Sequence, residues 1–227
     1  ILENGKVEKI ENVSAKHAEE TLSQKELSQL EIAQSEIRYR NVKQLQVRHL
    51  NFAYPDGKQI LKDISFKAEK GQIIGITGPV ACGKSTLGKV FLCEYPYEGQ
   101  ILVDGKELQN MPPSWQTNII GYLGHDPELF NDSVENNVLM GEQKKTEDFL
   151  KMVCMAEEVN EMDDGLQTLV GNGGVRLSGG QGKRLALART LCHKKPVLVL
   201  DDPFSALDKS TERQIFANLK AQAKENI

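Results

Sequence analysis

The stretch Gly78-Pro79-Val80-Ala81-Cys82-Gly83-Lys84-Ser85 decides the fold of this 227-residue chain. It follows an apolar run, Gln72–Thr77, that is typical of a buried parallel strand, and it opens a segment, Lys84–Cys93, that is expected to be helical. Glycines at this spacing let backbone N–H groups turn around phosphate oxygens, while Lys84 reaches the β- and γ-phosphates and the Ser85 hydroxyl ligates Mg²⁺. An ordinary glycine-rich turn is the alternative, but the flanking strand and helix argue against it. The sequence therefore predicts a phosphate-binding loop within an α/β fold.

Two carboxylates, Asp201 and Asp202, end a second apolar run, Val197–Leu200. The carboxyl end of a strand in an α/β sheet is where polar groups face a ligand crevice. Asp201 is therefore the expected partner of Ser85 at the Mg²⁺. A lone Asp in this position often caps a turn instead, but that interpretation weakens when the same chain carries a phosphate loop.

The remaining patterns predict a sheet before the loop and helices after it. Leu45–Phe52 alternates as a half-buried strand, and Ile60–Ala68 is expected to pair with it in antiparallel fashion. The other expected elements are strands at Gln100–Val103 and Ile119–Leu123, a helical stretch over about 133–191, and a closing helix at Thr211–Ala223. An α/β core interrupted by a helical insertion is the simplest architecture.

The composition argues against several classes of protein. A net charge of −4 disfavours a surface for nucleic acid. The four cysteines are scattered without a CxxC pair, which favours a reducing cytosol over a disulfide framework or a zinc site. No apolar stretch approaches the ~20 residues that cross a bilayer. Residues 1–44 are rich in Glu, Gln, Ser and Lys, so we expect a linker or connecting helix there, in a piece of a longer polypeptide.

Five stretches, taken in chain order, resemble the motifs of the ATP-binding cassette (ABC) family of ATPases. They are the aromatic Tyr54, the Walker A loop Gly78–Thr86, the signature Leu177–Gln181, Walker B at Val197–Asp202 and the D-loop Ser205–Asp208. The resemblance implies an α/β fold with a P-loop NTPase (RecA-like) core, an N-terminal antiparallel β subdomain and an inserted α-helical subdomain at about 126–191. The nucleotide-binding domain would fill 45–227.

The resemblance also implies the ligands, ATP and Mg²⁺, and the residues that hold them. Contacts to ATP are implied for Tyr54, Gly78, Pro79, Val80, Ala81, Cys82, Gly83, Lys84, Ser85, Thr86, Ser178, Gly179, Gly180 and Gln181. Ser85, Asp201 and His125 are the implied Mg²⁺ ligands, and Lys84, His125 and Asp202 have the implied catalytic roles. Without the other motifs, Tyr54 would more often be an ordinary core or surface tyrosine.

The signature motif implies a partner domain. Ser178 and the two glycines are expected to precede a helix over Gln181–Cys192, whose N-terminal N–H groups can face an anion. In the family, that anion is the γ-phosphate bound by the other subunit. The resemblance therefore implies a head-to-tail pair of nucleotide-binding domains, and a lone domain is expected to be a poor enzyme.

Two further stretches resemble exporters in particular. Glu128–Asn137 is similar to the segment after the Q-loop, and Thr168–Gly173 is similar to the exporter X-loop, although Asn172 stands where that loop usually carries Glu. Polar loops around helices are the alternative. The resemblance implies a transmembrane domain fused upstream, no nucleic-acid partner, and a location on the cytoplasmic face of the cell membrane.

Two positions depart from the family pattern. His125 stands where the Q-loop glutamine is usual, and Asp202 stands where the general base is usually Glu. Asp is one methylene shorter, and a misplacement of about 1 Å can cost roughly 10²-fold in rate. A harmless substitution to which the backbone adjusts is an equal alternative for Asp202. With an intact signature in the same chain, the combination of His125 and Asp202 predicts the weaker ATP site of a heterodimer. The family's switch histidine is expected to lie beyond Ile227.

Other functions remain open at this level. A regulatory module that binds ATP with little turnover would also explain Asp202 and His125. A soluble ABC ATPase outside transport is a further alternative, but it usually carries coiled-coil insertions or paired cassettes. A small-molecule kinase or a GTPase does not explain Leu177–Gln181.

Overall fold

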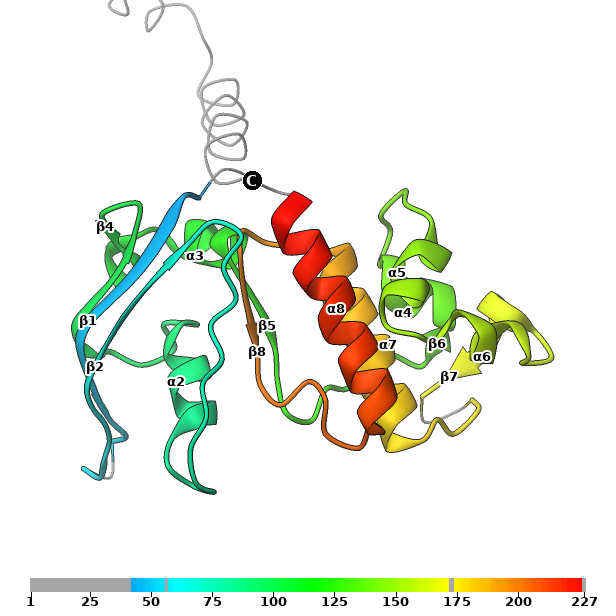
Figure 1. The fold of residues 1–227 in the computed structure, drawn as a ribbon, viewed down its shortest axis with the longest axis horizontal. Coiled ribbons are helices and arrows are strands. Elements are labelled where there is room, and N and C mark those ends of the chain that lie inside the picture. Colours follow the sequence, from blue (N-terminus) through cyan, green and yellow to red (C-terminus); the bar gives the residue numbers. More distant parts are fainter. Residues whose placement is uncertain (1–41, 56, 172–173, 226–227) are drawn as a thin grey trace, which may run out of the picture. The chain divides into compact units, whose positions relative to one another are not determined.

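The computed structural model describes residues 42–55, 57–171 and 174–225 (Figure 1). The linker expected over 1–44 thus lies almost wholly outside the described residues. Within the described residues, no helix is both long and apolar enough to cross a membrane.

An antiparallel sheet of four strands opens the described part of the chain. Its spatial order is β2-β1-β3-β4. The strands are β1 (Gln44–Ala53), β2 (Gln59–Glu69), β3 (Glu98–Val103) and β4 (Lys106–Glu107). Strand β1 pairs with both β2 and β3, and residues Leu45, Val47, Leu50 and Phe52 on it are buried. Strand β1 is therefore half-buried, as predicted, although an irregularity in its pairing between Val47 and Leu50 interrupts the strict alternation.

A second, parallel pair of strands carries the predicted carboxylates. Strand β5 (Ile120–Leu123) pairs in register with β8 (Val197–Leu200), from Ile120 opposite Val197 to Leu123 opposite Leu200. The expected strand at Ile119–Leu123 is confirmed except at its first residue, because Ile119 ends helix α3 (Pro113–Ile119).

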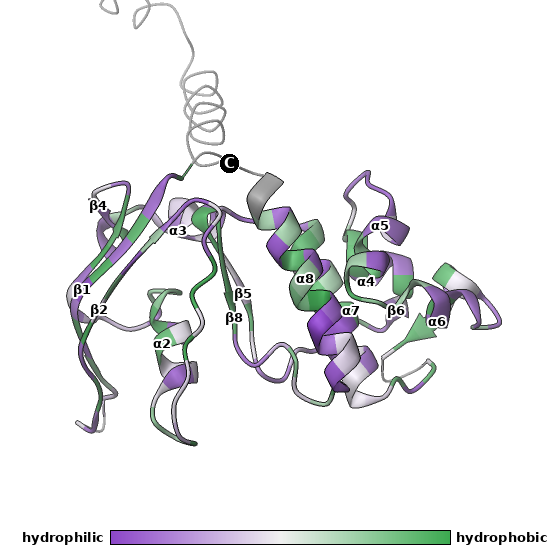
Figure 2. Cartoon of the chain, viewed as in Figure 1, coloured by the Kyte–Doolittle hydropathy of each residue, from purple (hydrophilic) through white to green (hydrophobic). Residues whose placement is uncertain are grey.

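The strand expected at Gln72–Thr77 is wrong. This segment has no strand assignment, and its side chains are exposed, with Ile73 45%, Ile74 44% and Ile76 51% accessible. Figure 2 shows it as part of the hydrophobic stretch between β2 and α2 (Lys84–Val90). No described strand pairs with it. An apolar run is buried in a sheet only where neighbouring strands take up its backbone groups and cover its faces.

Helices occupy most of the chain between Val134 and Cys192, as expected. They are α4 (Val134–Leu139), α5 (Thr146–Met152), α6 (Ala156–Asn160) and α7 (Gly179–Cys192), with the short paired strands β6 (Asp132–Ser133) and β7 (Leu169–Val170) among them. The closing helix is α8 (Lys209–Glu225).

Two clusters of buried apolar side chains pack these elements together. One joins the antiparallel sheet to α2 and α3, and it includes Leu50, Ile101 and Ile119, all 0% exposed. The other joins α4, α5, α7 and α8, and it includes Leu150, Leu185 and Ile215. Each fully buried Leu or Ile contributes about 1.5–3 kcal/mol to folding. The candidate site lies on the loops that leave these packed elements.

Candidate nucleotide site

The loop Gly78–Gly83 is a tight turn that leads into α2, and glycine is required where it closes. Gly83 precedes α2 with φ 99°, and a Cβ atom there would lie 2.8 Å from Cγ2 of Ile60. Any other side chain would be strained on both counts. The Lys84 ammonium donates hydrogen bonds to the carbonyl oxygens of Gly78, at 2.9 Å, and Pro79, at 2.7 Å. Lys84 therefore spans its own loop, with its charge held at the loop's centre.

The structure brings the predicted Mg²⁺ ligands Ser85 and Asp201 together. The Ser85 hydroxyl donates to Oδ1 of Asp201 at 3.0 Å, across 116 residues of sequence. The Asp201 N–H donates to the carbonyl of Leu123 at 2.8 Å, which continues the β5–β8 pairing by one residue. Two oxygen ligands suit Mg²⁺, which usually takes one or two protein oxygens and completes its shell with water and phosphate oxygens. The donor set at this position therefore fits the ion that the family implies.

Tyr122 borders this position and gave no signal in the sequence, where it is one residue of an apolar strand. Its hydroxyl is buried, and it lies close enough to Asp201 for the two groups to interact. Burial raises the pKa of Tyr122, and the nearby Asp201 carboxylate raises it further. The phenol is therefore neutral beside the carboxylate.

The two departures from the family pattern, His125 and Asp202, face each other. Nδ1 of His125 lies 3.4 Å from Oδ2 of Asp202, and both side chains are about half exposed. Nε2 of His125 lies 3.9 Å from Oδ1 of Asp126. Asp202 has φ 52°, in the left-handed region that is uncommon for residues other than glycine. The backbone turns sharply at Asp202, directly after the strand that delivers Asp201.

The signature residues form the start of helix α7. Ser178 is its N-cap: the Ser178 hydroxyl accepts from the Gln181 N–H, and the Gln181 side chain accepts from the Ser178 N–H at 2.9 Å. This reciprocal arrangement is a capping box. The expectation that both glycines precede the helix is wrong, because the capping box makes Gly179 and Gly180 its first residues.

A partly buried ion pair between Glu158 and Arg184 supports the start of α7. Glu158 accepts from Arg184 at 2.6 and 2.8 Å and from the Gln181 amide at 3.0 Å. The hydrogen bond from Arg184 is the main cause that lowers the pKa of Glu158. The Gln181 side chain and its N–H are thus engaged within their own chain, while the N–H groups of Gly179 and Gly180 remain available to an anion.

The start of α7 also contacts the loop after Asp202. A Cβ atom on Gly180 would lie 2.7 Å from the carbonyl oxygen of Ala206, so only glycine allows this approach. Lys183 donates a hydrogen bond to the Ser205 hydroxyl, and Ser205 donates to the carbonyl of Asp202 at 3.2 Å. A chain of two hydrogen bonds therefore joins the signature helix to the backbone of Asp202. The sequence contains no local signal for the role of Lys183.

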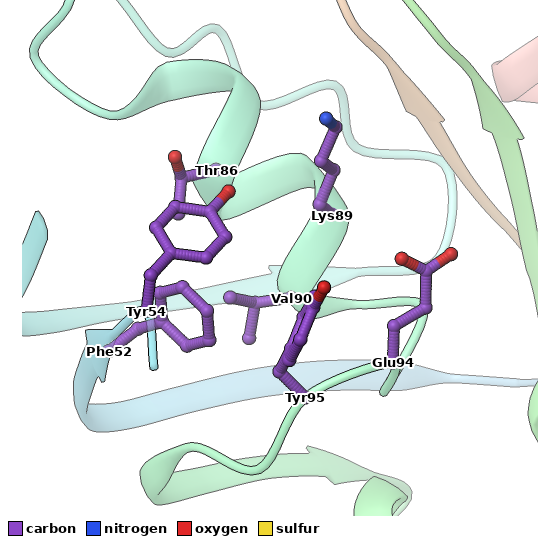
Figure 3. Close-up of a pocket in the computed structure, with 7 residues that line it drawn as sticks. All are labelled: Phe52, Tyr54, Thr86, Lys89, Val90, Glu94 and Tyr95. Carbon is purple, nitrogen blue, oxygen red and sulfur yellow. The ribbon is translucent and has the colours of Figure 1, made fainter. Parts of the chain in front are cut away.

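Tyr54 lines a pocket together with Thr86, the last residue of the Walker A stretch (Figure 3). The Tyr54 ring packs edge-on against Phe52, with centroids 4.9 Å apart, and against Tyr95, with centroids 6.0 Å apart. Lys89, Val90 and Glu94 complete the lining. The sequence motifs point to Tyr54 and Thr86 but not to the remaining residues of this pocket.

The family model described as ABC transporter matches residues 61–205, more than half of the chain. The chain belongs to the ABC transporter family. As an ABC transporter ATP-binding domain it has the expected mixed α/β fold, with an N-terminal antiparallel sheet and parallel core strands.

Similar proteins relate this ABC domain to exporters. A solved structure of a bacterial Atm1-family ABC exporter with ATP bound matches it with a TM-score of 0.74 at 31% identity, over 81% of this chain and 33% of the exporter chain. An ATP-dependent lipid A-core flippase of Pseudomonas aeruginosa is 41% identical over 77% of this chain and 30% of the flippase. ATP-binding cassette sub-family B member 6 of Xenopus tropicalis is 37% identical over 77% of this chain and 21% of its own length. The chain thus spans a third or less of each relative.

Alkylation of Cys82 is expected to lower the affinity of the ABC domain for ATP by at least about tenfold, because an adduct would overfill the loop that receives phosphate. Cys82 is exposed, and its sulfur lies 3.8 Å from the Lys84 ammonium. Mg-ATP should protect it from the reagent, as followed by mass spectrometry. The Cys82→Ser variant should bind ATP, and treatment with the alkylating reagent should not change its affinity. Full modification of Cys82 with unchanged ATP affinity would refute the expectation.

Proposed function

We propose that this domain binds Mg-ATP and, paired with a second nucleotide-binding domain, hydrolyses it to power export of a substrate across a membrane. The observation that carries this proposal is the 3.0 Å contact between Ser85 and Asp201, which joins the phosphate loop to the carboxylate at the end of a core strand. Similarity to exporters supports the direction of transport.

The chain's own residues have distinct roles in this proposal. The Walker A backbone and Lys84 bind the phosphates, and Tyr54 stacks on the base. Ser85 and Asp201 would hold Mg²⁺, which neutralises charge on the β- and γ-phosphate oxygens when it is bound. Asp202 would orient the attacking water, with His125 beside it rather than on the ion, since an imidazole nitrogen is a poorer Mg²⁺ ligand than oxygen.

We further propose that this domain contributes the weaker ATP site of a heterodimer. The Asp202 carboxylate is short for a general base, and His125 lies 3.4 Å from it. The signature, in contrast, is held by its capping box and by Glu158. The intact signature would therefore complete the strong site of the partner domain, on the cytoplasmic face of the membrane.

The two exporter-like stretches provide a surface for a fused transmembrane domain. The β6–β7 pairing joins Glu128–Asn137 to Leu169–Val170, while Asn172 and Gly173 lie outside the described residues. Phe130 and Leu169, 51% and 57% exposed, present apolar groups there. The Arg189 guanidinium forms a cation–π contact with the Phe130 ring, 4.7 Å from its centroid. We propose that this face receives the coupling helices.

A nucleotide-gated regulatory module is the second candidate. The contact between His125 and Asp202 favours it, because a base engaged by a neighbour is less free to position water. In that case the domain would bind ATP as described but would show little turnover in any assembly.

The Asp201→Asn variant tests the proposed site. In the wild type, Mg²⁺ should strengthen ATP binding, and Asp201→Asn should remove most of this Mg²⁺ dependence, because a neutral amide is a poor ligand for the ion. Asp163→Asn, at an exposed position away from the site, is the control. Isothermal titration calorimetry with ATP, with and without Mg²⁺, measures the difference. Equal Mg²⁺ dependence in all three proteins would contradict the assignment of Asp201.

A further inference from the structure

We propose that Glu94, in the pocket beside Tyr54, accepts a hydrogen bond from the edge of the nucleotide base. The domain would therefore bind 6-aminopurine nucleotides more tightly than 6-oxopurine nucleotides. This inference rests on the proposed ATP site and names the part of the ligand that this chain selects.

The pocket has two aromatic walls and a charged far side. Figure 3 shows Val90 between the rings of Tyr54 and Tyr95, with Lys89 and Glu94 on the side away from Tyr54. The two rings are nearly perpendicular, at 79°, so they cannot sandwich a planar base between parallel faces. A base that stacks on Tyr54 therefore meets polar groups at its edge.

The order of residues along α2 sets the direction of the ligand. Thr86 lies in the first turn, next to the phosphate loop, Lys89 and Val90 lie one turn further on, and Glu94 follows the end of the helix. Seven helical residues rise about 10 Å. A nucleotide with its phosphates at the loop and its base on Tyr54 thus directs the edge furthest from the ribose, which carries the substituent at position 6, towards Glu94.

The chemistry at that edge distinguishes the two kinds of purine. Adenine presents an amino donor at position 6 and an acceptor at N1, whereas guanine and hypoxanthine present an oxo acceptor and an N–H donor. An ionised carboxylate only accepts hydrogen bonds, and an ammonium only donates them. Glu94 therefore accepts from the 6-amino group, with Lys89 as a donor for the neighbouring ring nitrogen. An oxo group at position 6 would face the Glu94 carboxylate, and two acceptors cannot form a hydrogen bond with each other.

The surroundings of Glu94 support this role. Glu94 is exposed and lines the pocket, and no described residue forms a hydrogen bond or ion pair with its carboxylate. Glu94 thus has free acceptor capacity at the edge of the pocket.

The test compares ATP with inosine triphosphate, which replaces the 6-amino group by oxygen. Dissociation constants are measured on the chain by displacement of a fluorescent ATP analogue. The wild type should bind ATP about tenfold more tightly, as expected for one charge-assisted hydrogen bond at a partly exposed site. Glu94→Gln should bring the two affinities within about twofold, because an amide can donate as well as accept. Glu98→Gln, an exposed neighbour outside the pocket, should keep the wild-type ratio.

The inference is overturned if Glu94→Gln and Glu98→Gln show the same ratio of ATP affinity to inosine triphosphate affinity. It is also overturned if the wild type prefers inosine triphosphate. The Tyr95→Leu variant separates stacking from edge recognition: it should weaken both nucleotides alike and leave the ratio unchanged. The Lys84→Ala variant separates this inference from the proposed function. If Lys84→Ala leaves nucleotide binding intact, the proposed site itself fails. If nucleotide binding depends on Lys84, but Glu94→Gln leaves the ratio of the ATP and inosine triphosphate affinities unchanged, only the inference fails.

Discussion

Replacing Lys84 by alanine is expected to weaken ATP binding by at least about 100-fold, the value of two charge-assisted hydrogen bonds. The Lys84 ammonium donates to two carbonyl oxygens of its own loop, so its charge already lies where phosphate oxygens would be received. Its removal takes away both the charge and the contacts that close the loop. Equilibrium binding of a fluorescent ATP analogue measures the loss.

The matched control for this change is Lys62→Ala, an exposed lysine on β2 outside the site. It should bind ATP as the wild type does. Circular dichroism of both variants checks that the fold is retained. A folded Lys84→Ala protein with the affinity of the Lys62→Ala protein would show that the loop does not bind phosphate.

Within the assembled transporter, Ser178→Arg in this chain is expected to abolish hydrolysis, whereas Asp202→Asn should leave most of it. The reason is that each change acts on a different site of the pair. In the proposed heterodimer, Ser178 would begin the helix that faces the partner's ATP, and an arginine there removes the N-cap and would fill the space for the γ-phosphate. Asp202 would serve only the weaker site. Steady-state ATPase rates of the purified assembly give the comparison.

The controls are Ser114→Arg and Asp163→Asn, both at exposed positions away from the site. Ser178→Arg should still bind ATP, because its own Walker motifs are unchanged, and this separates loss of function from loss of fold. The opposite outcome, abolished hydrolysis in Asp202→Asn and normal hydrolysis in Ser178→Arg, would reverse the proposed asymmetry. Low hydrolysis in every assembly would favour the regulatory module.

The sequence predicted the elements whose pattern is set by one buried face. Within each half of strand β1 the pattern is local: Leu45 and Val47 alternate with polar residues, and so do Leu50 and Phe52. The irregular pairing between Val47 and Leu50 that brings both pairs into the core depends on the neighbouring strand. The prediction of a strand at Gln72–Thr77 is wrong for the opposite reason. The composition of this segment says only that it is apolar, whereas burial depends on which strands lie beside it.

The motifs predicted the meeting of Ser85 and Asp201 because each motif carries its own chemistry. They did not predict Tyr122, Lys183 or Glu94. These three residues acquire their places from packing between elements far apart in sequence: Tyr122 beside Asp201, Lys183 at Ser205 and Glu94 in the pocket beside Tyr54. The helix begins two residues before the predicted Gln181 and so includes both signature glycines, because the Ser178–Gln181 capping box outweighs their low helix propensity.

The unpaired segment Gln72–Thr77 is also expected to affect how the molecule behaves at high concentration. Six residues without charge or proline, with three exposed isoleucines, are typical of segments that stack into intermolecular β-structure. The neighbouring Val80 adds a further apolar group, 95% exposed. A charged substitution such as Ile74→Lys should therefore slow aggregation of the chain during purification, since charge on an open strand edge opposes pairing between molecules.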